Sequence, residues 1–304
     1  MCYPARLKVW FKSIRDVDSD QSKHHKTERG RIKHYHQSRY IGRLAKAIVP
    51  VIAFSAAMLR MGSLLRLGET GAALLQGKGA GTGWDMSAEL HAAARYIRRS
   101  NPVLMDVGAN HGKWSLGMLK LFPETQKIVL FEPQSECLSV LAEIALPDKT
   151  IVPCAVGDRS GTHAFFVGPP GWGAASLYSR AESYFSEIPQ REITVPVCSL
   201  DDIMDEQCIE YVDFIKFDIE GSELFALKGA SRAFDRRAIG ALSFEFGSGN
   251  INSRTYFRDF WELLVDRKFE IYRILPHGQM LCIRAYYEDL EYFRGVSNYV
   301  ARLV

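Results

Sequence analysis

The sequence predicts an α/β protein built on a doubly wound, mostly parallel β-sheet with an antiparallel hairpin at its C-terminal end. Two observations carry this prediction. From residue 103 onward, short apolar runs alternate with longer segments of helical spacing, which is typical of parallel strands joined by crossover helices. The first run ends in a glycine-rich turn that leads directly into a helix, and such a unit lets the backbone approach a nucleotide-like ligand.

The elements are expected in a regular order. Parallel strands are predicted at 103–107, 128–132, 150–156, 212–218 and 241–246, and helices at 86–99, 112–122, 135–145, 222–234 and 255–267. Extra strands at 161–167 and 192–198 flank a loop rich in glycine and proline. In this loop, Trp172 and Tyr178 could stack on a sugar ring or pack against the loop itself. Strands at about 269–275 and 280–284 are expected to close the chain as a hairpin, a common edge on mixed sheets.

The stretch that organises the rest is Val103–Gly112, VLMDVGANHG. Gly108 and Gly112 remove Cβ atoms where a ligand or a neighbouring strand approaches the chain. Glu132 follows Gly112 by 20 residues, at the tip of the next predicted strand. A carboxylate at that place can accept hydrogen bonds from both ribose hydroxyls, so a cofactor that contains ribose is expected.

The glycine spacing argues against a dinucleotide as that cofactor. A dinucleotide site needs the pattern G-x-G-x-x-G, but Asn110 stands at the middle position and the third glycine is displaced. Asp106, just before the turn, would repel a pyrophosphate. The same carboxylate suits a cationic ligand, such as the ammonium and sulfonium groups of S-adenosylmethionine.

Acidic residues recur at the carboxyl ends of the predicted strands, where ligands bind in doubly wound sheets. These residues are Asp106, Glu132, Asp218, Glu220 and Glu245. Lys216 and Asp218 alternate along one strand, so their side chains are expected on the same side and could form an ion pair. Ser222 is predicted to cap the next helix, Asp158 is interpreted as a turn residue, and Asp201 with Asp202 is interpreted as a cap of the following helix.

Composition and cysteine usage indicate a globular protein in a reducing compartment. The net charge of +3 hides an asymmetry: residues 1–46 hold 12 lysines and arginines against 4 acidic residues, and the rest holds 26 against 31. The 304 residues allow two domains, or one domain with a long arm. The six cysteines form no C-x-x-C pair, so neither a disulfide framework nor a zinc site is expected, and Cys154 and Cys198 are predicted to be free buried thiols.

The sequence assigns no definite function to residues 1–83. Residues 1–43 are expected to be a basic, disordered arm, and its histidines, His24, His25, His34 and His36, have no frame that would fix a metal site. Residues 44–67 contain an uncharged run of 13 residues, too short to span a bilayer, which favours a buried or interfacial helix. The glycine-rich stretch 68–83 lacks the spacing of a phosphate loop and is interpreted as a linker or a substrate-side loop.

The motifs DVGANHG, FEP, AVGD, SLDD and KFDIEGSE with LKGA occur here in the order found in FkbM-type S-adenosylmethionine-dependent methyltransferases, which residues 103–270 resemble. The resemblance implies a class I methyltransferase fold and O-methylation of a hydroxyl on a sugar or secondary metabolite. It assigns the methionine end of the cofactor to Asp106, Gly108, Asn110 and Gly112, the ribose to Glu132, the adenine to Ala155 and Val156, and the vicinity of the methyl group to Asp218. Cys154 stands where relatives often have asparagine.

Methyl transfer needs alignment of donor and acceptor more than it needs covalent help from the protein, although a base assists a hydroxyl acceptor. Asp218 is the first candidate for the base, followed by Glu220 and Glu245. The alternative roles of Asp218 are orienting the cofactor and holding a divalent metal, and no metal site is assigned.

Two alternatives to a methyltransferase remain open. The first is an enzyme linked to NAD or to a nucleotide sugar. The second is an inactive adaptor that has a methyltransferase-like core and contacts a membrane. The expected partner is a small-molecule or glycan acceptor, and no nucleic acid is expected. The expected location is cytoplasmic, because the first 40 residues lack the apolar core of a signal peptide. Peripheral contact of residues 1–67 with the inner face of a membrane is the alternative.

Overall fold

The computed structural model describes residues 43–58, 61–79, 85–145, 148–182 and 185–304. The predicted basic arm and its four histidines therefore lie outside the described residues, apart from residue 43. The chain forms two compact units, residues 1–63 and 64–304. In the first unit, helix α3 (Arg43–Met58) exposes large apolar side chains, including that of Phe54. None of the helices in the described part of the chain has the length and apolar character needed to cross a membrane.

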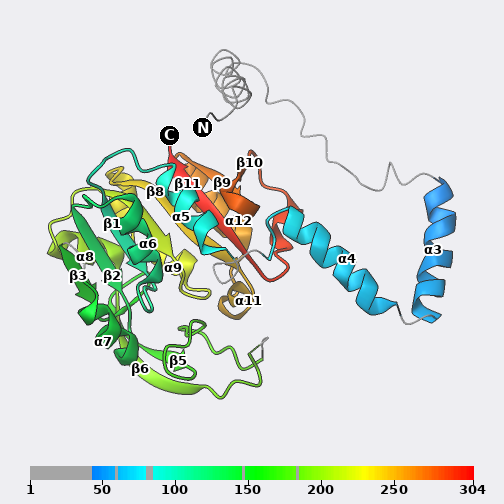
Figure 1. Cartoon of the computed structure of the whole chain (residues 1–304), viewed down its shortest axis with the longest axis horizontal. Helices are drawn as coiled ribbons and strands as arrows, with labels where there is room; N and C mark the ends of the chain where they lie inside the picture. The colour runs from blue at the N-terminus through cyan, green and yellow to red at the C-terminus, as the bar shows by residue number, and fades with distance from the viewer. Residues whose placement is uncertain (1–42, 59–60, 80–84, 146–147, 183–184) are drawn as a thin grey trace, which may run out of the picture. The chain divides into compact units, whose positions relative to one another are not determined.

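The second unit is organised around one eight-stranded sheet, whose strand order is β10-β9-β11-β8-β7-β1-β2-β3 (Figure 1). The strands are β1 (Val103–Val107), β2 (Lys127–Phe131), β3 (Lys149–Val152), β7 (Val212–Phe217), β8 (Ile239–Gly247), β9 (Phe269–Ile274), β10 (Met280–Ile283) and β11 (Val296–Leu303). Strands β3, β2, β1, β7 and β8 run parallel, whereas β11 is antiparallel to both β8 and β9. Strand β10 pairs antiparallel with β9. These pairings confirm the predicted mostly parallel α/β sheet and its C-terminal hairpin.

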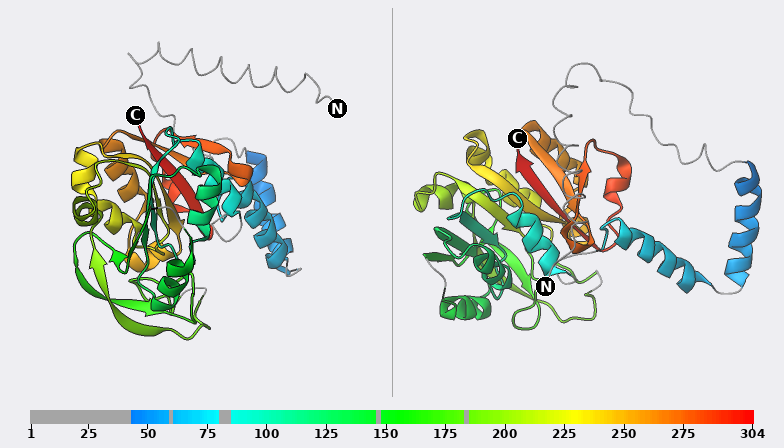
Figure 2. Two further views of the ribbon diagram at one scale, coloured as in Figure 1. Left: turned by 60° about the vertical axis from the view of Figure 1, so that its left-hand side comes forward. Right: turned by 45° about the horizontal axis from the view of Figure 1, so that its top comes forward.

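Helices cover both faces of this sheet (Figure 2). One face packs against α5 (Met86–Ala94), α6 (Lys113–Leu121) and α7 (Ser135–Glu143). The other face packs against α8 (Leu200–Glu206), α9 (Glu223–Lys228), α10 (Ser231–Asp235) and α12 (Phe257–Asp266). Side chains alternate between the two faces along each strand, so that Leu104 and Phe214 lie in the α5–α6 core and Met105 and Ile215 in the opposite one.

A second, three-stranded sheet lies beside the first and has the order β4-β6-β5. Its strands are β4 (Ala155–Val156), β5 (Gly161–Val167) and β6 (Arg191–Cys198). The predicted strand 150–156 is therefore divided, with β3 in the large sheet and β4 in the small one. The division occurs at Pro153, which has no N–H to donate to a ladder.

The prediction that Cys154 and Cys198 are free thiols is wrong, because the structure joins them in a disulfide. Strand β4 pairs in parallel with the end of β6, opposing Val156 to Cys198. This pairing brings the Cα atoms of the two cysteines to 6.2 Å, although 44 residues separate them in sequence. Their proximity follows from a pairing between strands in a second sheet, which cysteine spacing alone does not reveal.

Three helical and strand predictions also need correction. The late hairpin does not close the chain, because β11 follows it and inserts between β8 and β9. The predicted helix 222–234 is two helices, α9 and α10, which meet near Gly229. Helix α4 (Gly62–Leu75) runs through Gly68 and Gly71, so the first half of the glycine-rich stretch is helical and not a linker.

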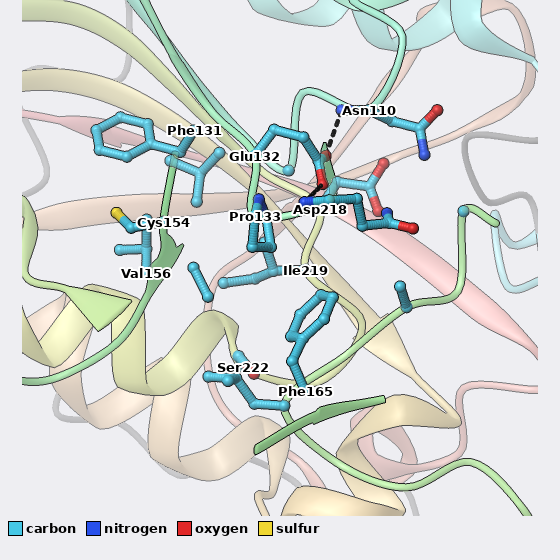
Figure 3. A pocket seen from close by; sticks show the side chains of 17 residues that line it. Asn110, Phe131, Glu132, Pro133, Cys154, Val156, Phe165, Asp218, Ile219 and Ser222 are labelled. Atoms are coloured by element: carbon cyan, nitrogen blue, oxygen red, sulfur yellow. Dashed lines mark hydrogen bonds between the residues drawn. The ribbon is translucent and has the colours of Figure 1, made fainter. Parts of the chain in front are cut away.

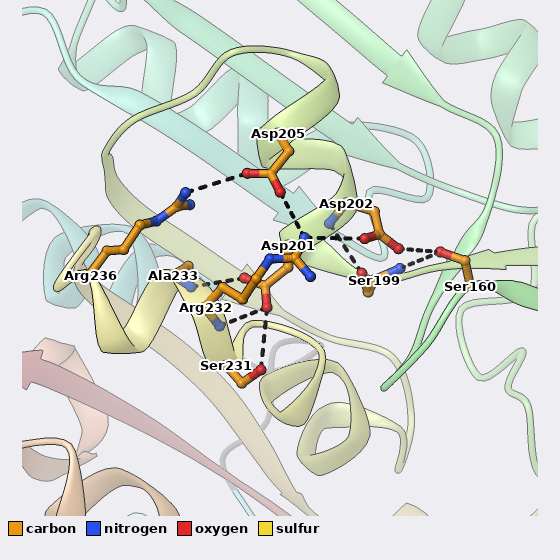
Figure 4. Close-up of polar contacts among 9 residues, drawn as sticks. All are labelled: Ser160, Ser199, Asp201, Asp202, Asp205, Ser231, Arg232, Ala233 and Arg236. Atoms are coloured by element: carbon orange, nitrogen blue, oxygen red, sulfur yellow. Dashed lines mark hydrogen bonds and ion pairs between the residues drawn. The ribbon is translucent and has the colours of Figure 1, made fainter.

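Ser199 and Asp201, which follow β6, cap two different helices (Figure 4). Ser199 caps its own helix α8, since its Oγ accepts a hydrogen bond from the Asp202 amide at 3.1 Å. The Asp201 carboxylate instead accepts hydrogen bonds from the amides of Arg232 and Ala233, at 2.7 and 2.8 Å, at the start of α10. The prediction that Asp201 caps the helix in which it lies is therefore wrong, and its role is to fix α10 against α8.

Candidate functional site

The carboxyl ends of β1, β2 and β7 border a cavity on the large sheet (Figure 3). Of the residues predicted to bind cofactor, the cavity is lined by Gly108, Asn110, Glu132, Ala155 and Val156. Asp218 also lines it, directly after β7. Residues that are up to 110 positions apart in the sequence thus meet at one edge of the sheet, as expected for the switch point between β1 and β7 in a doubly wound fold.

The turn after β1 is held by close packing as well as by its hydrogen bonds. Gly108 has a φ of +82°, and a Cβ at this position would lie 2.0 Å from the carbonyl oxygen of Asp218. The amides of Gly108 and Ala109 both donate to the Phe131 carbonyl oxygen, at 3.1 and 3.0 Å. Glycine is therefore required here because the chain after β1 lies in contact with the chain after β7. This requirement holds whether or not a ligand is bound.

Gly112 stands directly before α6 (Lys113–Leu121). It has a φ of +70°, and its Cα faces Ile144 and Leu141 of the α7 region, which would lie within 3.0 Å of a Cβ. It is not among the residues that line the cavity. Its effect on the site is to let α6 start close to the chain that follows α7.

Glu132 is the buried carboxylate of the cavity, with 2% of its surface exposed. Its Oε2 accepts a hydrogen bond from the Asn110 amide at 2.8 Å, and its Oε1 accepts one from the Gln134 amide at 2.9 Å. Burial raises the pKa of this carboxyl, and the two amide bonds oppose that rise. Each carboxylate oxygen keeps a further lone pair, so Glu132 can also accept hydrogen bonds from a ligand in the cavity.

Asp106 lies behind the cavity wall and is fully buried. Ser115 Oγ donates to one of its oxygens at 2.6 Å, and Lys216 Nζ lies 3.4 Å from the other. Lys216 also lies 3.1 Å from Asp218, so one buried ammonium bridges two carboxylates. Burial alone would lower the pKa of Lys216, but Asp218 and Asp106 outweigh it and the pKa is raised. The ion pair of Lys216 and Asp218 that the alternation predicts is therefore present.

The remaining wall of the cavity is apolar and carries one hydroxyl. Phe131, Val156, Phe165 and Ile219 contribute apolar surface. Ser222 stands at the start of α9, but its Oγ makes no capping bond and has no hydrogen-bond partner among the described residues, although the residue is 1% exposed. An unpartnered buried hydroxyl costs about 1–3 kcal/mol.

Asp218, Glu220 and Glu245 form an acidic group next to the cavity, with carboxylate oxygens within 4.8 Å of one another. Arg180 forms an ion pair with Glu220, which occupies one of the three. Burial, followed by the nearby charges of Asp218 and Glu220, raises the pKa of Glu245 well above its ordinary value.

Two residues of this region were not singled out from the sequence. The Glu223 carboxylate is fully buried and accepts hydrogen bonds from the amides of Ile219 and Gly221, the latter at 2.9 Å. Gly221 has a φ of +106° and packs against Gly249, so the turn that carries Glu220 is fixed on both sides. Arg180 comes from the loop between β5 and β6, and its pairing with Glu220 depends on how that loop folds back. Neither contact has a signature in local spacing.

Comparison with known proteins identifies the family. The model of the methyltransferase FkbM domain matches residues 106–271. "Methyltransferase sdnD" of Sordaria araneosa is 30% identical over 158 residues, which cover 43% of this chain and 61% of that protein. Among solved structures, methyltransferase FkbM from Methylobacillus flagellatus is 16% identical with a TM-score of 0.42, over 73% of this chain and 60% of that one.

A putative rRNA methylase from Clostridium thermocellum is 10% identical with a TM-score of 0.41, over 72% and 97% of the two chains. This chain thus spans about three fifths of the length of the first two proteins. The family match includes the β1 turn, Glu132, the divided strand β3–β4 and the acidic end of β7. Because the domain model matches more than half of its residues, the chain belongs to the methyltransferase FkbM domain family.

Proposed function

We propose that this protein is an S-adenosylmethionine-dependent O-methyltransferase that acts on a hydroxyl of a sugar, glycan or secondary metabolite. The observation that carries the proposal is the cavity at the ends of β1, β2 and β7. In it, the buried Glu132 carboxylate and the unpartnered Ser222 hydroxyl share an otherwise apolar slot. A nucleoside has the matching parts, because ribose offers two hydroxyl donors and adenine offers a flat apolar face with a polar edge.

Different residues of the cavity would bind different parts of the cofactor. Glu132 is held in place by two backbone amides and can accept from the ribose hydroxyls. Val156 and Phe165 provide apolar surface for the adenine, and Ser222 Oγ provides a hydrogen bond to its edge. Asn110 and Asp218 line the part of the cavity that is left for the methionine end. Asp106 would not contact the cofactor directly. Its carboxylate is bound by Ser115 and Lys216, and these contacts stabilise the end of β1 next to the turn.

Bound S-adenosylmethionine would supply an electrophilic methyl group, so the chain must position an acceptor oxygen and take up its proton. Asp218 is the base that the geometry supports best. Its carboxylate lines the cavity, and the charged Lys216 lies 3.1 Å away, which leaves a second oxygen for the acceptor. Glu220 forms an ion pair with Arg180, and Asp218 is the one of the three carboxylates that lines the cavity.

Calorimetric titration with S-adenosylmethionine and with NAD, side by side, tests the proposal. We expect binding of the first at one site per chain and no heat from the second, because Asn110 and Asp106 replace the features that hold a pyrophosphate. Binding of NAD alone would assign the cavity to an oxidoreductase. Binding of neither compound would favour an inactive methyltransferase-like core.

A further inference from the structure

We propose that the acceptor binds in a second cavity, formed by α4, α5 and the turn after β9, and that it is an uncharged, hydroxyl-bearing compound with an apolar body. This inference rests on the function proposed above. The cavity has a volume of about 510 Å³, within the range of about 300–1,000 Å³ of small-molecule sites. It lies within the second unit of the chain, whose first residue is 64.

The composition of the walls indicates the class of acceptor. Apolar surface comes from Leu74 and Leu75 of α4, Ala88 of α5, and Ile274 and Leu275 at the end of β9. Four polar side chains complete the wall: Asp85, Glu89, His277 and Asn298. Among the described residues that line this cavity there is no lysine or arginine, and two are acidic. Such walls disfavour phosphorylated or carboxylated acceptors, and their aliphatic side chains favour an acceptor with an apolar body.

A row of buried polar residues connects this cavity with the cofactor cavity. Asn298 donates a hydrogen bond to Glu89 at 2.8 Å, and it stands opposite Glu245 in the pairing of β11 with β8. Glu245 in turn has a carboxylate oxygen within 4.8 Å of one of Asp218, which lines the cofactor cavity. These side chains share the face of the sheet that α5 covers, because Ala241 and Val300 of the same strands lie in the core beneath α5. Within the second cavity, an acceptor hydroxyl beside Glu89 and Asn298 would therefore lie at the end that this row joins to Asp218.

Direct contacts fix the α4 wall against the C-terminal strands. Arg294 forms an ion pair with Glu69 at 3.1 Å and donates to Thr70 Oγ1, also at 3.1 Å. Arg273 donates to the carbonyl oxygen of Gln76 at 3.2 Å. At Gly77, with a φ of +73°, a Cβ would lie 2.5 Å from the Ile274 carbonyl oxygen. The apolar wall is thus part of the packed second unit and not a separate arm.

Every described residue that lines the second cavity lies outside residues 106–271, the part that matches the family model. The cofactor cavity, in contrast, is lined by residues 107–222, all within that part. The chain therefore combines a donor site from the shared domain with an acceptor cavity built from its own flanking segments. Acceptor choice in this protein would then depend on the described lining residues within 71–75, 85–89 and 274–277, and on Asn298.

Photolabelling with a neutral octyl glucoside that carries a diazirine in its alkyl chain tests the assignment on the full chain. We expect labelled peptides from 64–79 and 269–279, located by mass spectrometry. In the Leu75→Asp variant, labelling should fall about tenfold, because a charge replaces part of the apolar wall. Leu75 is 81% exposed, so the substitution leaves folding intact. The matched control is Leu67→Asp, at a residue of α4 that is 68% exposed and does not line the cavity.

Retained labelling in Leu67→Asp with loss in Leu75→Asp supports the acceptor cavity. Equal loss in both variants would show adventitious detergent contact with α4, and labelling outside these segments would place the acceptor elsewhere; either result overturns the inference. Calorimetry with S-adenosylhomocysteine on the same samples separates the two proposals. If the expected segments are labelled but S-adenosylhomocysteine does not bind, the proposed function is contradicted. If S-adenosylhomocysteine binds but other segments are labelled, only the acceptor site is contradicted.

Discussion

Glu132 and Asn110 are joined by a 2.8 Å hydrogen bond from the Asn110 amide to the Glu132 carboxylate, across 22 residues of sequence. This bond connects the end of β2 to the turn after β1. The carboxylate that is proposed to bind ribose therefore also holds the turn that surrounds the ligand. A change at Glu132 should affect both the shape of the turn and the contact with the cofactor.

Replacing Glu132 by glutamine is expected to weaken cofactor binding by about 10- to 100-fold, since one charged acceptor is lost and the new NH₂ group faces an amide donor. Calorimetric titration of S-adenosylhomocysteine measures the effect. Glu136→Gln is the matched control, because Glu136 is an exposed residue of α7 that pairs with Arg191 on the surface. Equal affinity in the Glu132 variant and the control would show that Glu132 does not contact the ligand.

Ser222→Ala should separate binding from stability. The hydroxyl has no partner among the described residues, so its removal is expected to leave the melting temperature unchanged or slightly raised. If the hydroxyl binds adenine, the same variant loses about 1 kcal/mol of cofactor affinity, roughly fivefold. Ser199→Ala serves as a contrast, because it removes the cap of α8 and should lower stability by about 1 kcal/mol without changing cofactor affinity. An unchanged affinity in Ser222→Ala would remove Ser222 from the adenine site.

Lys216→Met is expected to destabilise the fold by about 3–5 kcal/mol, because it leaves the fully buried Asp106 carboxylate without its cation. Denaturant unfolding followed by circular dichroism gives the value. Adding Asp106→Asn to Lys216→Met removes the buried charge as well and should recover more than half of the loss. Additive effects of the two substitutions would contradict the coupling between these residues.

Glu223 predicts a specific pH dependence of stability. Burial raises the pKa of this fully buried carboxyl to about 7, above its ordinary value of 4.5. The folded state therefore binds the proton more tightly than the unfolded state, and the resulting stability is complete below about pH 4.5 and is lost as the pH rises towards 7. Relative to that of the Glu223→Gln variant, the free energy of unfolding of the native protein should fall by about 1.4 kcal/mol per pH unit across this window.

Urea unfolding at a series of pH values checks that slope. The exposed Glu143→Gln variant should run parallel to the native protein throughout. A constant difference between the native protein and Glu223→Gln from pH 5 to 7 would mean that Glu223 titrates in the folded state as it does in the unfolded chain.

The disulfide between Cys154 and Cys198 predicts sensitivity to reducing agents. It closes a loop of 44 residues, for which about 3–4 kcal/mol of stabilisation is expected. Because Cys154 also lines the cofactor cavity, reduction should lower both the melting temperature and the affinity for S-adenosylhomocysteine. The Cys198→Ser variant should show the melting temperature and the affinity of the reduced protein, with or without dithiothreitol. A native protein that does not respond to dithiothreitol would indicate that the bond does not form in solution.

The sequence was sufficient to predict the central strands because they are buried on both faces and read as continuous apolar runs, such as Val103–Met105 and Ile128–Phe131. Strand β11 was missed because VSNYVARL mixes polar and apolar residues, and its buried Ser297 and Asn298 do not look like core positions. Of the two cavities, only the first could be predicted from local sequence, because turns that directly follow strands form much of its wall.

The second cavity could not be predicted because its walls come from segments that are about 200 residues apart. These segments meet through packing at Gly77 and through the ion pair of Arg294 with Glu69. Glycines in helix α4 also read as a flexible joint, although tertiary contacts keep them helical. The acidic residues at the strand ends were predicted to gather at one rim, and the structure places Asp218, Glu220 and Glu245 together there. The ion pair of Glu220 with Arg180 depends on how the loop between β5 and β6 folds, and local sequence does not reveal it.

The insertion of β11 between β8 and β9 imposes an order on assembly. During synthesis, β8 and β9 leave the ribosome before β11, and neither can complete its hydrogen-bonded ladder until that strand arrives. A nascent chain thus carries two open edges and an unfinished second cavity, since Asn298 lies on the late strand. Recognition of the acceptor would be the last property that the newly made protein acquires, after the nucleoside site has already formed.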